Sequence, residues 1–429
     1  MTVASGSFRM RLAGAYPSIE NAWDARLFLR YLFALFWAFV LVRLIVNAHI
    51  LDKAVNYSGE GGSIVEKIHP STYGIALVLI ATLLSTRIEF DDWGLRALRS
   101  LMTFALIIGG IATFTLLLGH TGSIGYLVDS YLVACAGGAL MLCFPPSWRQ
   151  WLGRTLLVFI AAGACVALAE FALQTRLLPY PLQELSFRPT GLSEHPLVLG
   201  LFNAVGINFV AATRWKAAAK AGVIVVMLLG TVAAGARIAT LVAGLSTLSV
   251  IALQQWPSMP PETRFRMKAA LLLAVLLAVP AVLAVLFQLG LLERFQNGLF
   301  DESAMARVSV YGLFGLASWS DILFGADIGR IRSLASEHFD LDFIESSIVM
   351  FVFQFGLIGT IIFLLFMART FLILLAGAGR HVVIGTCAFF MVASANNGLS
   401  TKTPTVLMIV LLIVAFHGAR PAPAVNSRR

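Results

Sequence analysis

Charged residues are scarce in this chain of 429 residues: Asp, Glu, Lys and Arg make up 12% of it, against 59% for hydrophobic residues. A soluble globular protein carries about 25% charged residues, so a surface of this composition could not be kept in water. The shortage of charge therefore excludes a soluble enzyme, a soluble DNA-binding protein and a disordered scaffold. The mean hydropathy of +0.86 agrees with this exclusion.

Cysteine is scarce as well, and familiar enzyme motifs are missing. The four cysteines lie in apolar runs, with no CxxC pair and no histidine cluster nearby, so we interpret them as buried thiols: Cys135, Cys143, Cys165 and Cys387. The chain has no P-loop, GxGxxG, HExxH or GxSxG motif. It therefore offers no site for ATP or a dinucleotide, and we expect neither a cofactor nor a metal.

Long apolar runs are what the sequence has instead. A transmembrane helix needs about 20 predominantly apolar residues, and on that basis we predict twelve spans. They cover residues 27–48, 71–87, 100–118, 125–144, 152–173, 196–213, 217–235, 237–255, 268–290, 346–367, 381–396 and 403–418. The first run is long enough to remain as an anchor, so a cleaved signal peptide is not expected.

The expected fold class is all-α, a polytopic integral membrane protein of about twelve transmembrane helices. We expect one membrane domain over residues 1–429, divided into spans one to nine (27–290), a large outer loop (291–345), spans ten to twelve (346–418) and a cytoplasmic tail (419–429).

The distribution of Lys and Arg predicts the sidedness. With the N-terminus inside, twenty of the 31 Lys and Arg residues fall in cytoplasmic segments, ten fall on the opposite side and Arg43 lies within the first span. Cytoplasmic loops of membrane proteins carry an excess of Lys and Arg, so both termini are predicted to be cytoplasmic. The formal net charge of +9 has the same explanation, and no nucleic-acid partner is expected.

This topology places two long loops on the outer face, 174–195 and 291–345. The second is the largest polar segment, with nine acidic residues and four arginines. A large outer loop beside short inner ones indicates that the protein works on its outer face. The loop includes Asp340-Leu341-Asp342, which has the form of a metal-binding DxD motif. Because nucleotide sugars are found in the cytoplasm and this motif faces away from it, we interpret it as a solvated acidic segment.

Three arginines lie on the outer face, close to span ends or in the large loop. Arg188 opens an RPTG turn that leads through His195 into the sixth span, Arg237 lies in the tight turn between spans seven and eight, and Arg307 lies in the large loop. An Arg without a partner at the bilayer rim costs on the order of 2 kcal/mol. We therefore expect Arg237 to snorkel or to hold an anion. Guanidinium groups bind phosphate oxygens bidentately, so the three would suit a lipid-linked phosphate or pyrophosphate. The simpler alternative is that each anchors a helix end at the headgroups.

Two acidic residues are candidates for chemistry or for ion pairing. Glu345 stands at the start of the tenth span, where partial burial of a carboxylate raises its pKa and suits a general base. The alternative is an ion pair with one of the arginines. Glu170 lies about one turn from the outer end of the fifth span, where it would pair with Arg176 or line a cavity. Arg43 has the same two interpretations.

Four local features together resemble the O-antigen ligase/polymerase superfamily of bacterial envelope glycosyltransferases, and within it the exopolysaccharide polymerases. They are Arg188-Pro189-Thr190-Gly191 with His195-Pro196-Leu197, Gly235-Ala236-Arg237, the large loop with Arg307, and Glu345-Ser346-Ser347 leading into Phe355-Gly356-Leu357-Ile358-Gly359. Their order and spacing over residues 185–365 are similar to those of the family. The first five spans match it in hydropathy alone.

The resemblance implies a GT-C-like enzyme of the bacterial inner membrane that performs a metal-independent, inverting glycosyl transfer at the periplasmic face. The donor would be a glycan on undecaprenyl pyrophosphate, held by Arg188, Arg237 and Arg307. Glu345 falls where ligases of the family carry a His-Asn pair, which favours a polymerase with Glu345 as the base. His338, seven residues upstream, would partly compensate for the missing histidine. The Ser usual before the second arginine is Ala236 here.

Three functions are therefore carried forward. The first is polymerisation of polysaccharide repeat units, with Glu345, Arg237 and Arg307 as catalytic residues and Arg188, His195, His338 and Glu170 as substrate-binding residues. The second is a ligase that transfers the glycan to a lipid acceptor. The third is a transporter or flippase of lipid-linked sugars, which should show charges near the middle of several spans. A polymerase would work beside a flippase and a chain-length regulator.

Overall fold

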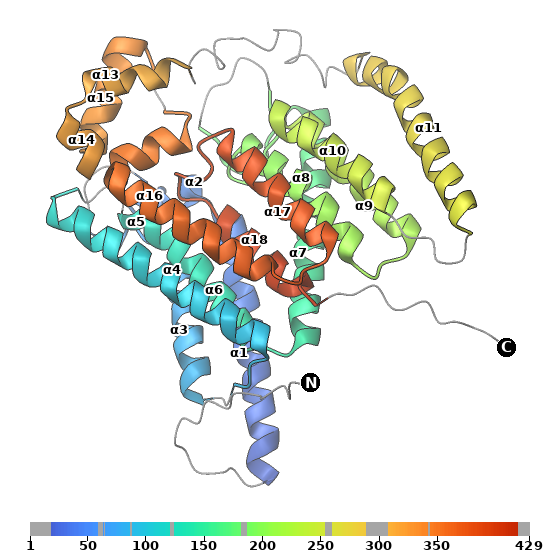
Figure 1. Cartoon of the computed structure of the whole chain (residues 1–429), viewed down its shortest axis with the longest axis horizontal. Coiled ribbons are helices and arrows are strands. Elements are labelled where there is room, and N and C mark those ends of the chain that lie inside the picture. Colours follow the sequence, from blue (N-terminus) through green and yellow to red (C-terminus); the bar gives the residue numbers. More distant parts are fainter. Residues whose placement is uncertain are drawn as a thin grey trace, which may run out of the picture. The chain divides into compact units, whose positions relative to one another are not determined.

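The computed structural model describes residues 19–58, 63, 65–85, 88–120, 124–181, 187–253, 260–288, 308–341 and 344–418. Within these ranges the regular structure is helical, with no β-strand (Figure 1). The expected all-α class is therefore confirmed for the described part of the chain.

Each predicted span coincides with a helix or a run of helices. These are α1 (Ile19–Ile45), α3 (Pro70–Ser85), α4 (Asp92–Leu117), the run of α5 (Ile124–Tyr126), η2 (Leu127–Leu132) and α6 (Val133–Leu142), α7 (Pro146–Leu173), α8 (Pro196–Ala212), α9 (Ala217–Ala233), α10 (Arg237–Leu253), α11 (Pro261–Gln288), α16 (Ser347–Leu375), α17 (Arg380–Ser394) and α18 (Thr405–Phe416). The described loops contain five shorter helices: α2 (Ala48–Leu51), the 3₁₀ helix η4 (Val310–Gly312), α13 (Leu313–Leu316), α14 (Trp319–Phe324) and α15 (Ile328–Phe339).

Five helices of the described residues are long and apolar enough to cross a membrane: Arg26–Ile45, Asp92–Leu117, Ile124–Leu142, Pro146–Leu173 and Ser347–Leu375. Several others are equally apolar but have 10–17 residues. The chain is thus a helical membrane protein. The helix of the tenth predicted span is longer than the span, since it continues past residue 367 through Arg369 to Leu375. One arginine does not end a helix whose flanking residues are apolar and favour helix formation.

The described residues pack as two compact units, each built from separate stretches of the chain. Unit 1 comprises residues up to 153 together with 306–377 and 396–415, and unit 2 comprises 154–305 with 378–395 and the chain from 416.

In unit 1, α16 packs along α4, and α6 packs against both α3 and α4. Glycines bring α6 close to α18: a Cβ at Gly137 would lie 2.6 Å from Leu407, and a Cβ at Gly138 would lie 2.7 Å from Val410. The helix backbones approach closely because these positions carry no side chain, which is the usual way helices pack inside a membrane.

In unit 2, α8 is the central helix, in contact with α9, α10 and α17. Nearly every residue of α8 is buried, which explains why it is apolar on all sides. Gly200 of α8 faces Ala236, and Gly230 of α9 faces Ala164 of α7, at distances that leave no room for a side chain. The α9–α10 turn is therefore held close to α7 and α8.

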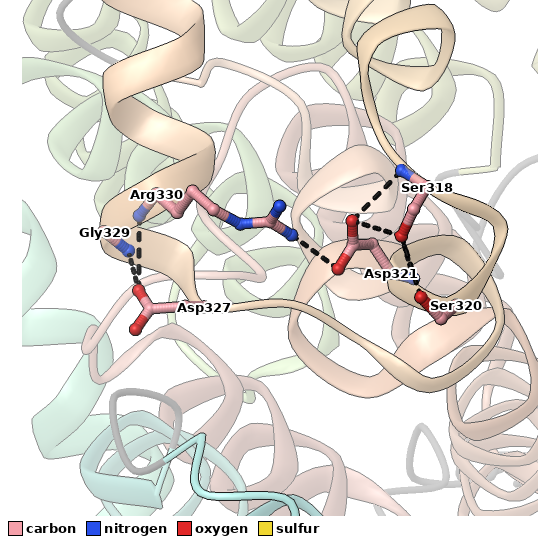
Figure 2. A network of polar contacts seen from close by, with 6 residues as sticks. All are labelled: Ser318, Ser320, Asp321, Asp327, Gly329 and Arg330. Atoms are coloured by element: carbon pink, nitrogen blue, oxygen red, sulfur yellow. Dashed lines mark hydrogen bonds and ion pairs between the residues drawn. The ribbon is translucent and has the colours of Figure 1, made fainter.

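The described part of the large loop, residues 308–341, is folded into short helices that share an apolar core. Its polar contacts are shown in Figure 2: Arg330 of α15 reaches Asp321 of α14, which also bonds to Ser318. Ser318 and Asp321 form a capping box at the start of α14, and Asp327 caps α15 through the amides of Gly329 and Arg330. These caps fix the ends of helices too short to be stable alone.

Candidate functional site

Glu170 organises the loop between α7 and α8. Its side chain is 3% exposed, in the last turn of α7. One carboxylate oxygen accepts the amide of Leu177 at 2.7 Å, and the other accepts the amides of Thr190 and Gly191 at 2.8 Å each. A buried carboxylate is stabilised by several N–H donors of this kind. The geometry therefore favours a role in holding the RPTG turn over its predicted role in binding substrate.

The RPTG turn is pressed onto α7 at a glycine. Gly191 has φ +56, a left-handed conformation that favours glycine, and a Cβ there would overlap the carbonyl oxygen of Gly163. The sequence therefore needs glycine at the end of this turn for both conformation and space. Arg188, at the start of the turn, is held in place by the same packing.

Arg188 connects this loop to the α9–α10 turn. Its side chain is 5% exposed, and its Nε donates to the carbonyl oxygen of Ala234 at 2.9 Å. Ala234 itself packs in a small buried cluster with Ala167 of α7 and Leu199 of α8. The structure thus brings together two of the segments, RPTG and GAR, that the sequence analysis singled out from positions some 46 residues apart.

Arg176 and His195 border the same junction. The Nε of Arg176 donates to the carbonyl oxygen of Arg188 at 2.9 Å, and its guanidinium lies 4.3 Å from the ring centre of Tyr180. The rings of Tyr180 and His195 approach edge-on at 5.6 Å. His195 is also the N-cap of α8, where its Nδ1 accepts the amide of Leu197 at 3.1 Å. That nitrogen is therefore unprotonated, and the ring is oriented by the helix end.

Arg237 is the first residue of α10 and is half-buried. The turn before it contains Gly235 at φ +61, which allows α9 and α10 to be joined by only three residues. The N-terminus of a helix carries a partial positive charge, so Arg237 adds a full positive charge to an end that is already positive. This combination suits an anion, because the N-terminus of a helix and a guanidinium both favour negative charge.

A second polar centre lies in unit 1 and surrounds Asp129 of η2. The Asp129 carboxylate is fully buried and accepts from the Tyr57 hydroxyl at 2.8 Å, the Thr72 hydroxyl at 2.7 Å and the His69 amide at 2.9 Å. Arg43 donates to the carbonyl oxygens of Asp129 and Lys402, at 3.3 Å each. The Arg43 guanidinium thus donates to backbone oxygens of η2 and of the loop before α18.

Lys402 and His69 complete the Asp129 centre. The Lys402 ammonium donates to the carbonyl oxygens of Tyr57 and Lys67, and burial lowers the pKa of Lys402 to about 8. Burial, followed by the nearby Arg43, lowers the pKa of His69 to about 3, so its ring is neutral. The ring bonds to the carbonyl oxygen of Val46 and to Ser71. Asp129 and its partners thus connect η2 to the segment between α1 and α3 and to the loop before α18.

The remaining predicted residues belong to the large loop. Glu345 is half-buried, one residue before the N-cap Ser346 of α16. Ser347 donates to the carbonyl oxygen of Asn396 and accepts the amide of Leu399, so the Glu345-Ser346-Ser347 motif is fixed to the 396–399 loop. His338 is exposed on α15. Arg307 and Asp342 lie outside the described residues.

The Asp129 centre was not predicted from the sequence, although a signal was present. Asp129 is an acidic residue inside the predicted span 125–144, and intramembrane acids normally have a specific partner. Arg43 was noted for the same reason, but nothing in the spacing of the two indicates that they meet. Tyr57, His69 and Thr72 lie in or beside a loop and carry no pattern that marks them.

No protein-family model matches this chain, and no curated protein matches it in sequence.

Proposed function

We propose that the chain is a membrane-embedded glycosyltransferase that polymerises undecaprenyl-pyrophosphate-linked glycan repeat units at the periplasmic face of the bacterial inner membrane. The observation that supports this most directly is the hydrogen bond from Arg188 to Ala234, which holds one predicted donor-binding arginine against the turn that presents the other, Arg237. The resemblance of the RPTG, GAR and ESS motifs to the O-antigen ligase/polymerase superfamily supplies the reaction class.

The chemistry follows from the leaving group. As the glycosidic bond breaks, negative charge grows on the pyrophosphate oxygens. Fixed cations therefore stabilise the transition state more than the ground state. Arg237 at the start of α10 supplies such a charge, and the buried Arg188 keeps the neighbouring turn rigid. Arg307 is proposed as the third cation of this set. The reaction is inverting and uses no metal in this proposal.

Glu345 is proposed as the general base that takes the proton from the acceptor hydroxyl. Glu345 lies immediately before α16, and Ser347 is bonded to the 396–399 loop, so the backbone that carries the Glu345 carboxylate is held in place. Polymerisation then requires one acid-base residue and a set of cations, without a cofactor.

In this proposal all twelve predicted spans cross the membrane in a GT-C-like arrangement, with both termini cytoplasmic. The test is labelling by an impermeant maleimide in intact cells, with single cysteines in a cysteine-free background. Position 320, exposed in α14, should label from outside, and position 262, exposed in the first turn of α11, should not. Labelling of position 262 from outside would overturn the topology and the periplasmic site.

The ligase and the transporter are the alternative functions. His338 would serve a ligase, and it is exposed on α15. For a transporter, the buried charges of Arg43 and Asp129 are the relevant observation, because intramembrane charges mark transport pathways. Asp129 lies in the first third of its helix run, however, and is surrounded by hydrogen-bond donors, which favours a structural role.

Transfer by the purified protein separates the three functions. The protein in nanodiscs is given an undecaprenyl-pyrophosphate-linked repeat unit, alone or with a lipid A core acceptor. A polymerase makes chains from the repeat unit alone, a ligase makes product only with the acceptor, and a transporter makes neither. Absence of polymer from the repeat unit of the native polysaccharide would overturn the proposal.

A further inference from the structure

Residues 308–316 are helical throughout and present an exposed face without polar side chains. Val308, Tyr311 and Leu316 are 66%, 56% and 42% exposed, and Gly312 and Gly315 complete the same face at the i, i+3, i+4, i+7 and i+8 spacing. The opposite face carries Val310, Leu313 and Phe314, which pack in the core of the loop. The segment is therefore apolar on both faces, one packed in the core of the loop and the other exposed.

The next helix continues this apolar surface. In α14, Trp319 is 78% exposed and Phe324 is 45% exposed. Large apolar side chains exposed in consecutive short helices mark a surface that meets another apolar phase. Helix α15 has the opposite character, because Arg330, Arg332 and Glu337 are exposed on it.

The depth of this surface is fixed by α16. Ala326 donates to the carbonyl oxygen of Phe353 at 2.7 Å, and α16 breaks at Gly356, where φ is +73. The end of α14 lies against that break, since a Cβ on Gly356 would be 2.6 Å from the carbonyl carbon of Phe324. Phe324 is thus level with the break in α16.

The part of α16 after the break is long enough to cross the bilayer by itself. From Gly356 to Leu375 it rises about 30 Å at 1.5 Å per residue, which equals the hydrocarbon thickness. Residues 349–356 are buried, whereas Leu357 and Ile358 begin the exposed apolar surface of α16. The short helices of the loop therefore cover part of the first turns of α16 and end beside Gly356, just before the exposed Leu357 and Ile358.

We propose that residues 308–324 form an interfacial anchor, in which Val308, Tyr311, Leu316, Trp319 and Phe324 insert into the outer leaflet of the bilayer. The end of this segment lies against Gly356, next to the exposed apolar residues Leu357 and Ile358 of α16. Trp and Tyr prefer the headgroup level of membranes, and binding at the interface strengthens with the apolar area that is buried there. The anchor holds α15 and Glu345 at the membrane surface, with the polar side of α15 in water.

The test uses the full chain with its four cysteines replaced and a nitroxide at one position. Labels go to 311, 316 or 319 on the proposed anchor, to 358 as a lipid-facing reference and to 336, exposed on α15, as an aqueous reference. In liposomes of phosphatidylethanolamine and phosphatidylglycerol, we expect positions 316 and 319 to be several-fold more accessible to oxygen than to a water-soluble nickel reagent, as at 358. Position 336 should show the reverse preference.

A second measurement keeps the native cysteines. Trp319→Phe retains an apolar ring at a highly exposed position, so the fold should be unaffected. The emission lost in this variant belongs to Trp319, and we expect brominated lipids to quench it. Nickel accessibility at 316 and 319 equal to that at 336, or Trp319 emission untouched by brominated lipids, would overturn the anchor. Low accessibility to both reagents with concentration-dependent spin broadening would instead assign the surface to a second copy of the chain.

Discussion

The Nε atom of Arg188 donates to the carbonyl oxygen of Ala234 at 2.9 Å, and this bond fixes the α7–α8 loop to the α9–α10 turn. Ala234 is three residues before Arg237, so the position of one arginine constrains the backbone that presents the other. The carboxylate of Glu170 holds the same loop through the amides of Thr190 and Gly191. The end of unit 2 where α7 stops and α10 starts is therefore a rigid frame around Arg237.

Arg237→Lys tests whether this frame presents a bidentate phosphate clamp. Lysine keeps the charge but loses the two-pronged geometry. Loss of one charge-assisted hydrogen bond worth about 1.5–3 kcal/mol corresponds to about a 10- to 100-fold lower transfer rate. The measurement is polymer formed by purified protein, and Arg214→Lys, exposed between α8 and α9, is the matched control. Activity of Arg237→Lys within twofold of wild type would mean that Arg237 is a headgroup anchor.

Glu345→Gln tests the proposed base. Glutamine preserves the shape of the side chain but cannot take up a proton. General-base catalysis contributes about 10²–10⁴ in rate, so polymer synthesis should nearly stop while the lipid-linked donor still binds. Glu337→Gln, on the exposed side of α15, should behave as wild type. Near-normal polymer from Glu345→Gln would leave Glu345 as a structural residue of the loop.

Glu170→Ala should act on stability before it acts on chemistry. The substitution leaves the amides of Leu177, Thr190 and Gly191 without their buried acceptor. Each unsatisfied buried group costs about 1–3 kcal/mol, so the melting temperature in detergent should fall by many degrees. Hydrogen exchange at Thr190 and Gly191 should accelerate. A variant with the wild-type melting temperature but no transfer would restore the prediction that Glu170 binds substrate.

Acid should destabilise unit 1 through His69. Its folded pKa of about 3 lies below its ordinary value of 6.5, so the unfolded chain binds the proton first. The contribution of neutral His69 to the free energy of unfolding is fully present above pH 6.5. It falls as the pH drops from 6.5 towards 3, by up to about 1.4 kcal/mol per pH unit. The groups facing the ring are Tyr57, Arg43 and the Asp129 carboxylate that accepts the His69 amide. Unfolding at pH 7.5 and pH 5 should show a smaller difference for His69→Gln than for wild type, and equal differences would contradict this role.

Gly356→Ala should separate the loop helices from α16. Alanine strains the backbone at φ +73, and its Cβ would collide with the end of α14. We expect lower thermal stability and faster proteolysis between residues 317 and 345. Gly222→Ala in α9 is the control, because nothing lies within 4 Å of its Cβ position and alanine favours helix by about 1 kcal/mol. Equal melting temperatures for the two variants would show that the close contact of Gly356 with α14 does not stabilise the large loop.

Much of the architecture could be predicted from the sequence, because the bilayer constrains the hydropathy and the length of each segment that crosses it. A helix in hydrocarbon must be apolar over a length set by the bilayer, and so each predicted span coincides with a helix or helix run. The helix ends were less predictable, since α1, α4, α7 and α11 begin before the predicted spans and α16 runs past residue 367. The helices of the large loop were not predicted. These helices are too short to show a periodic pattern in the sequence. Their formation depends on a shared apolar core and on caps such as Ser318 with Asp321.

The sequence by itself determined that the chain is a helical membrane protein and that Arg237 and Glu345 stand at the starts of helices, because hydropathy and charge are local properties. Only the tertiary structure decided what those residues contact. In the structure, the Glu170 carboxylate accepts three backbone amides and Arg188 donates to Ala234. Tyr57, His69 and Thr72 all donate to the Asp129 carboxylate. These contacts join residues far apart in the chain. Their partners are set by how helices pack, which no local pattern encodes.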